Sequence, residues 1–197
     1  MTDSTTDMEA TLAPPRDKRD RLVEGASRAF YEQGVEHTTL ADVARLADVP
    51  LGNVYYYFKT KDELVEAVIA AHAKLVTSTL AGLERHRTPR ERLKAFARLL
   101  RSQADAAASY GCPQGTLCSE LDKRQDGLGR EAAELVRIPI DWAEQQFRAM
   151  GRRDARDLAV ALIASHQGIS LLTNALRTPE LMARETRRLE RWIDSLE

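Results

Sequence analysis

Apolar residues recur every three to four positions along most of the chain, which is the spacing of one buried face on an α-helix. Leu22, Ala26, Ala29 and Phe30 follow this spacing and predict a first helix that ends near Gly34. No segment sustains the alternation of apolar and polar residues that indicates a half-buried strand. The pattern therefore predicts an all-α protein of about nine helices.

Two short helices are predicted between Thr38 and Lys61, joined by about three residues. Thr39 offers an N-cap oxygen to the first of them. Pro50 disfavours helix at the residue before it, and a second short helix is predicted over 51–58. Such a pair is the arrangement of a helix-turn-helix, whose second helix enters the major groove of DNA. Many helical proteins contain short helix pairs, so the spacing alone is weak evidence.

Longer helices are predicted in the rest of the chain. Thr60 and Glu63 have the spacing of a capping box, which predicts a helix from Lys61 to about Glu84. Thr88 and Pro89 mark the start of the next helix. The later helices are expected over residues 129–150, with a bend near Pro139, over 154–177, and from Thr178 to the end of the chain.

The segment 154–177 carries apolar residues at alternating steps of four and three, as in helices that pair along a common stripe. Together with two residues of the last helix, this stripe is expected to pair with a second copy of the chain as a four-helix bundle. The residues expected in this dimer interface are Leu158, Leu162, Ser165, Ile169, Leu172, Leu189 and Trp192.

Composition predicts a disordered arm at 1–15, and the predicted helices divide the rest into a helix-turn-helix domain at 16–62 and a helical body at 63–197. The arm lacks the apolar core of a signal peptide. The longest uninterrupted apolar run, 158–164, is far shorter than the roughly 20 residues of a membrane span. We therefore expect a cytoplasmic protein without a membrane partner.

The formal net charge of −1 does not indicate a nucleic-acid partner, because binding to a polyanion depends on Lys and Arg. Net charge averages over surfaces, however. Arg16, Lys18, Arg19 and Arg21 cluster just before the first apolar stripe and could form a basic patch. A run of charges is more often a solvated face, so this cluster decides little.

Residues 38–64 carry a more specific signal. The sequence TTLADVARLADV, followed after two residues by GNVYYYFKTKDEL, resembles the helix-turn-helix signature of the tetracycline-repressor (TetR) family. The likeness extends over residues 17–70. Two departures stand out, since family members often carry Gly at the position of Asp48 and a polar or basic residue at that of Leu51. Asp tolerates the left-handed conformation that such a turn needs, so the fold is expected to be kept.

The resemblance implies a function. It implies a homodimer that binds a palindromic DNA operator through an N-terminal helix-turn-helix, and a C-terminal body that binds a small-molecule effector and dimerises. The expected role is that of a repressor released by its effector. Neither the effector nor the operator can be identified from the sequence, nor can the direction of the effector's action.

Spacing assigns roles within the second short helix. Val54 and Phe58 share one face and are expected to anchor it, which turns Gly52, Asn53 and Tyr56 outward. Gly52 would let the backbone approach the groove, Asn53 would contact a base edge, and Tyr56 a thymine methyl group or a phosphate. The alternative is a half-buried aromatic helix, but one face of so short a helix cannot bury three tyrosines.

The resemblance adds phosphate contacts to these base contacts, with help from backbone amides at helix starts. The residues expected to touch DNA are Thr39, Gly52, Asn53, Tyr55, Tyr56 and Lys61.

The body carries more large apolar residues than one thin layer of core requires, which predicts a cavity with a few polar groups. For each residue, a place in a solid core is at least as well supported. The candidates for ligand contact are Phe96, Leu100, Leu117, Cys118, Trp142, Gln146, His166 and Thr173.

Other chemistry has little support. The four histidines show no His-x-x-x-His pair, and the chain has no nucleophile elbow or Gly-rich phosphate loop, so no enzyme, metal or cofactor is expected. Cys112 and Cys118 would sense oxidants or electrophiles if their pKa values were depressed, although cysteines are more often simply buried. Two alternatives stay open: a thiol sensor on the same scaffold, and a helical binding module without sequence-specific DNA binding.

Overall fold

The structure is a computed structural model that describes residues 17–124 and 127–196, except for the side chain of Leu100. The expected arm at 1–15 lies outside the described residues. Over the described ranges all regular structure is helical, and the expected all-α class is confirmed. The helices are α1 (Lys18–Gln33), α2 (Leu40–Ala47), α3 (Leu51–Tyr57), α4 (Lys61–Leu83), α5 (Pro89–Leu99), the 3₁₀ segment η1 (Leu100–Gln103), α6 (Ala104–Tyr110), α7 (Pro113–Leu121), α8 (Leu128–Ala132), α9 (Glu134–Ala149), α10 (Ala155–Leu176) and α11 (Glu180–Asp194).

The described residues form more helices than the nine or so expected, because two segments that were each expected as one helix are broken. The helix expected from Thr88 passes through η1 into α6, and the segment 129–150 is divided into α8 and α9. Within the segment after Gly111, Pro113 occupies the first position of α7. The 3₁₀ segment η1 spans only four residues and the break between α8 and α9 only Ala133, so the apolar spacing does not reveal either break.

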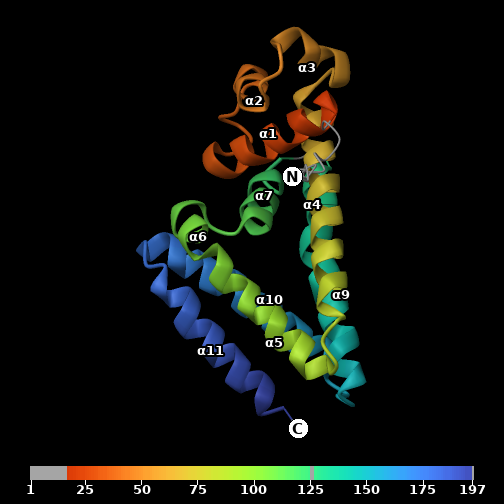
Figure 1. Cartoon of the computed structure of the whole chain (residues 1–197), viewed down its shortest axis with the longest axis vertical. Coiled ribbons are helices and arrows are strands. Elements are labelled where there is room, and N and C mark those ends of the chain that lie inside the picture. The colour runs from red at the N-terminus through yellow and green to blue at the C-terminus, as the bar shows by residue number, and fades with distance from the viewer. Residues whose placement is uncertain (1–16, 125–126, 197) are drawn as a thin grey trace, which may run out of the picture.

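Figure 1 shows α1, α2 and α3 together at one end of the molecule, with α4 running from them along the body beside α9. α10 packs on α9 and α11 towards the other end. α7 lies between the two groups and contacts α1, α8 and α9. α4 thus connects the short helices to the body directly, and α7 supplies a second connection.

Apolar side chains form two cores, and α4 contributes to both. Val54 and Leu64 lie in the first core, which also takes in Leu117 of α7. Phe147 lies in the second core together with Leu80, which is near the C-terminal end of α4. The first core therefore continues past residue 62 into the segments expected to form the body, and the boundary at 62–63 stays a prediction.

Side-chain caps fix where the helices begin. Thr39 Oγ1 accepts a hydrogen bond from the Asp42 backbone N–H at 3.2 Å, and the Asp42 carboxylate accepts one from the Thr39 N–H at 3.1 Å. Thr88 and Glu91 make the same reciprocal pair before α5. Thr60 Oγ1 accepts from the Glu63 N–H at the start of α4. Such a cap contributes about 1 kcal/mol to helix stability.

By length and composition alone, α4 and α10 are apolar enough to cross a membrane. Core helices of proteins that never enter a membrane meet the same criterion. The length of the longest apolar run in the sequence does not reveal these two helices, because polar residues interrupt the apolar residues of both.

Candidate functional site

The turn between α2 and α3 is held in a fixed shape. Asp48 adopts the left-handed conformation, with φ of 50°, which non-glycine residues rarely do. The Arg21 guanidinium donates to the Asp48 carbonyl oxygen at 2.6 Å and to its carboxylate at 3.0 Å. Gly25 lets α1 approach α2, since a Cβ there would lie 3.1 Å from the Ala47 nitrogen. These contacts fix the direction in which α3 leaves the turn.

α3 is anchored by one face, as its spacing predicts. Val54 is fully buried and Phe58 is 2% exposed, and the Arg19 guanidinium lies 5.2 Å from the centre of the Phe58 ring. Tyr55 and Tyr56 are 52% and 74% exposed. A helix that is held by its inner face and presents aromatic side chains outward is suited to contact another molecule.

The remaining positions of α3 divide between the two faces. Asn53 is partly exposed, and a Cβ at Gly52 would meet no atom of the chain within 4 Å. Tyr57 is half-buried against the first core, and its ring meets that of Tyr56 at 4.9 Å in an edge arrangement. The aromatic run therefore serves both the core and the outer surface.

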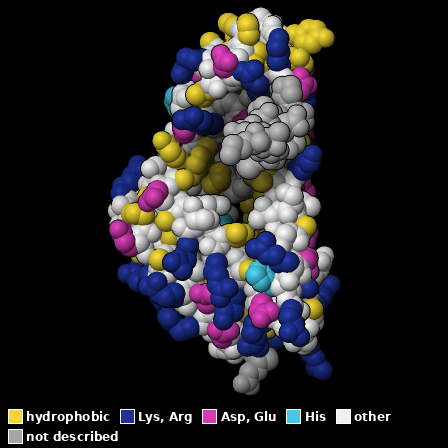
Figure 2. Space-filling view, viewed as in Figure 1, with side chains coloured by type: hydrophobic (Ala, Val, Ile, Leu, Met, Phe, Trp, Pro, Cys, Tyr) yellow, Lys and Arg dark blue, Asp and Glu magenta, His cyan; other side chains and the backbone are white. Residues whose placement is uncertain are grey.

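The residues expected to contact phosphates lie at the same end of the molecule. Thr39 is exposed at the start of α2. Lys61, at the start of α4, is half-buried, and its Nζ donates to the carbonyl oxygen of Glu36 at 3.2 Å. Figure 2 shows hydrophobic, Lys and Arg side chains interspersed at this end. Of the expected basic cluster, Arg19 contacts Phe58 at the end of α3, Arg21 contacts the turn, and Arg16 lies outside the described residues.

Three polar contacts tie the helix-turn-helix to α7 and the turns beside it. The Tyr31 hydroxyl donates to the Gly111 carbonyl oxygen at 2.7 Å. The Glu120 carboxylate accepts from the Glu36 N–H at 2.8 Å. The Arg124 guanidinium lies 2.7 Å from the Asp62 carboxylate. These contacts join residues 62 to 84 positions apart, so no local pattern indicates them.

The sequence of this chain is similar to those of known bacterial regulators. The model of the bacterial regulatory proteins, tetR family, matches residues 22–68. The HTH-type transcriptional regulator TtgR of Pseudomonas putida is 29% identical over 173 residues, which cover 87% of this chain and 71% of TtgR. The uncharacterized HTH-type transcriptional regulator YxaF of Bacillus subtilis is 30% identical over 179 residues, covering 86% of this chain and 92% of YxaF. The chain belongs to the TetR family.

A solved structure extends the likeness to the whole fold. The TetR transcriptional regulator of Legionella pneumophila superposes with a TM-score of 0.80, covering 92% of this chain and 98% of that one. Its sequence identity of 17% means that this comparison bears on the fold alone. The TetR-family relatives are transcriptional regulators with a helix-turn-helix, so this chain is a DNA-binding regulator and not an enzyme.

Two of the candidate ligand residues line a cavity of about 340 Å³ between α4, α5, α9 and α10. Phe96 and His166 face each other there, with ring centres 5.6 Å apart. Burial lowers the pKa of His166 from its usual 6.5 to about 4, so the ring is neutral at pH 7. His166 therefore lies on a cavity wall and not in a solid core.

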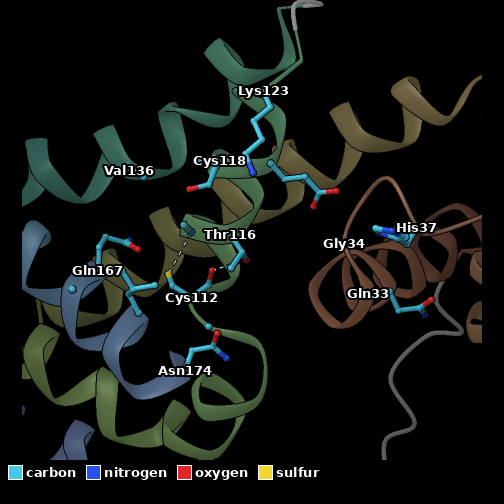
Figure 3. A pocket seen from close by; sticks show the side chains of 16 residues that line it. Gln33, Gly34, His37, Cys112, Thr116, Cys118, Lys123, Val136, Gln167 and Asn174 are labelled. Carbon is cyan, nitrogen blue, oxygen red and sulfur yellow. Dashed lines mark hydrogen bonds between the residues drawn. The ribbon is translucent and has the colours of Figure 1, made fainter. Parts of the chain in front are cut away.

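A larger cleft of about 780 Å³ separates the helix-turn-helix from the body. Figure 3 shows Gln33 and His37 on one side and Cys118, Gln167 and Asn174 on the other. This cleft is the space that α7 spans with the three polar contacts.

The other candidate ligand residues lie away from the smaller cavity. Trp142 Nε1 and Gln146 Nε2 both donate to the Glu84 carboxylate, at 2.9 and 3.2 Å, and Arg92 pairs with that carboxylate at 2.8 Å. Trp142 packs behind the cavity wall, since its ring centre lies 5.7 Å from that of Phe96, which lines the cavity. Leu117 and Thr173 are buried, and the side chain of Leu100 lies outside the described residues.

The two cysteines do not have the surroundings of reactive thiols. Burial, with Cys112 nearby, raises the pKa of the Cys118 thiol to about 11. The Cys118 thiol donates to the Ala132 carbonyl oxygen at 3.0 Å. Cys112 is buried and caps α7, where its sulfur accepts from the Gly115 N–H at 3.5 Å. The raised pKa keeps the Cys118 thiol protonated and unreactive, and Cys112 is buried, which argues against the thiol-sensor alternative.

The residues expected in the dimer interface are divided between core and surface. Leu162, Ile169 and Leu189 are buried within the second core, so a charge at any of them would disrupt the chain itself. Leu158, Ser165 and Trp192 are half-buried, while Leu172 is 53% exposed. The exposed apolar surface of α10, which we call the α10 outer face, shares only Leu172 with the expected set. It consists of Val160, Ala161, Ala164, Gly168, Leu171, Leu172, Ala175 and Leu176.

Proposed function

We propose that this chain is a repressor that binds a palindromic operator as a homodimer and is released by a small-molecule effector. The observation that carries the proposal is the exposed face of α3. Tyr55 and Tyr56 project from a helix that Val54 and Phe58 lock in place beside a turn fixed by Arg21. A dimer would place two copies of α3 in successive major grooves, about 34 to 36 Å apart. A chain that acts on DNA in this way would work in the cytoplasm.

Each of the expected DNA contacts has a role that its chemistry supports. Asn53 would contact a base edge, where its amide offers both a donor and an acceptor. Tyr55 and Lys61 would bind phosphates, and Thr39 would do so from the start of α2. Tyr56, the most exposed of the three tyrosines, would contact a thymine methyl group or a phosphate.

The α10 outer face supports the homodimer. Leu171 and Leu176 are 67% and 61% exposed, and small residues at Ala164 and Gly168 would let a second helix approach closely. An apolar stripe of this kind marks a protein–protein interface more often than bare surface. The exposed side of α11 is rich in arginine, so α10 would form most of the contact.

The connections through α4 and α7 support regulation from the body. An effector acts on DNA binding only through unequal affinity for two arrangements of the protein. α4 lines the 340 Å³ cavity with Leu75, Val76, Thr79 and Leu80, and its first turn carries Lys61. Gln114 of α7 also lines this cavity. A ligand that moved α4 or α7 would thereby change the spacing of the two α3 helices.

Selection of bound duplexes from random DNA tests the proposal. The full-length chain should enrich a palindrome, and a Tyr56→Ala variant of equal thermal stability should enrich it less. If the wild-type chain shows no preference over random duplex at moderate salt, the repressor proposal fails. A helical binding module without sequence-specific DNA binding would then be the better explanation.

A further inference from the structure

The 340 Å³ cavity between α4 and α10 has walls without charge. Leu75, Leu80, Leu99 and Ile163 supply much of its surface, and Pro139 of α9 closes part of it. None of the described residues that line it is Asp, Glu, Lys or Arg. A charged group that entered this cavity would lose part of its water and meet no opposite charge on the walls. The walls therefore disfavour anions and cations alike.

Five polar side chains of described residues line the cavity: Thr79 and Gln103, and three more where α10 meets the start of α7. His166 and Gln167 line the cavity from α10, and Gln114 lines it from α7. The Gln167 Oε1 leaves no room for a Cβ on Gly115, so this side chain lies against α7. Within the described part of the chain, the hydrogen bond of His166 uses its backbone oxygen, which leaves its ring available, and the Gln167 side chain lies between this cavity and the larger cleft. Both groups can bind a ligand.

These groups can both donate and accept hydrogen bonds without carrying charge. The lowered pKa of His166 leaves its imidazole neutral, with one nitrogen as donor and the other as acceptor. The Gln167 amide likewise offers an oxygen acceptor and an N–H donor. A hydroxyl or carboxamide group matches this pair, whereas an ionised group would need a counter-charge.

The volume sets the size of the molecule. An apolar cavity of about 150 Å³ accommodates benzene. The volume here, about 340 Å³, is roughly twice as large and suits two fused rings with one substituent.

We infer that this cavity binds an uncharged, mostly apolar molecule of about two fused rings, whose polar group hydrogen-bonds to His166 and Gln167. The inference rests on the proposed function, because it names the chemical class of the effector. It also places the polar end of that molecule beside α7, which contacts the helix-turn-helix.

Three matched probes test this inference by calorimetry on the full-length protein: naphthalene carboxamide, naphthalene carboxylate and naphthylmethylammonium. The carboxamide should bind, and the two charged probes should bind at least about 100-fold more weakly. The inference is overturned if none of the probes binds, or if either charged probe comes within tenfold of the carboxamide.

Two lysine variants of α4 establish where the probes bind. Leu75 is 59% exposed at the rim of the cavity, so Leu75→Lys can fold and place a cation at the cavity. It should reduce the preference for carboxamide over carboxylate at least about tenfold, since the carboxylate gains a partner. Thr77→Lys, which adds the same charge to an exposed position of α4 that does not line the cavity, should leave the preference unchanged. Equal effects of the two variants would place binding elsewhere and overturn the inference.

A separate titration distinguishes this inference from the proposed function. A saturating carboxamide should weaken binding to the enriched operator. If calorimetry gives the expected preference while operator affinity stays constant, the ligand class stands and the proposed release by effector fails.

Discussion

Leu172→Glu should separate the proposed dimer without unfolding the chain. Leu172 is 53% exposed in the single chain, so the monomer tolerates a carboxylate there. Burial of a whole leucine side chain contributes about 1.5 to 3 kcal/mol, and roughly half of that is available to a partner at this position. A two-fold axis doubles the loss to about 1.5 to 3 kcal/mol, before any repulsion between the two carboxylates. The dissociation constant of the dimer should therefore rise about 10- to 100-fold or more.

Sedimentation velocity over a concentration series measures this change, with circular dichroism melting as the check on folding. Leu75→Glu is the matched control, because Leu75 is similarly exposed, at 59%, but lies on α4. The control should stay dimeric. If Leu172→Glu assembles as tightly as the control, the α10 outer face is not the interface.

Three further predictions concern DNA contact, coupling and pH. Tyr55→Phe and Lys61→Ala should weaken binding to all duplexes, whereas Asn53→Ala should also relax preference at one operator position, as anisotropy titrations against single-base variants would show. Tyr31→Phe removes one hydrogen bond worth about 0.5 to 1.5 kcal/mol, so it should change the effect of a bound ligand on operator affinity about two- to tenfold; an unchanged effect would exclude this contact from coupling. Because the pKa of His166 is lowered, the stability from its neutral form is present above pH 6.5 and is lost as the pH falls towards 4, by up to about 3 kcal/mol. Urea unfolding should show that His166→Gln loses less stability than the wild-type chain between pH 6.5 and 4.

Local rules were sufficient for the helix-turn-helix. Caps at Thr39 and Thr60 and the proline at Pro50 act within a few residues, so the ends of α2, α3 and α4 follow from the sequence. The same holds for the inner face of α3, since Val54 and Phe58 are one helical turn apart. The left-handed Asp48 was expected as well, but its partner Arg21, 27 positions away, was not.

The body could be predicted only as a set of helices. Periodicity shows that one side of α10 is apolar, but it does not show whether a given stripe meets the chain's own helices or another chain. Leu162 and Ile169 fill the chain's own core, and the exposed apolar residues lie on another side of the helix. The residues that line the cavity are decided by the same long-range packing. Trp142 and Gln146 were expected in the cavity, but both donate hydrogen bonds to the Glu84 carboxylate instead.

Hydroxyl-radical footprinting of the full-length chain on its enriched operator tests the central claim most directly. The account predicts two protected half-sites related by a two-fold axis, with centres about 34 to 36 Å apart on one face of the duplex. Protection should weaken at both half-sites together in Leu172→Glu, because each α3 depends on the dimer. A single protected site, or uniform protection without half-sites, would contradict the proposed dimeric operator complex.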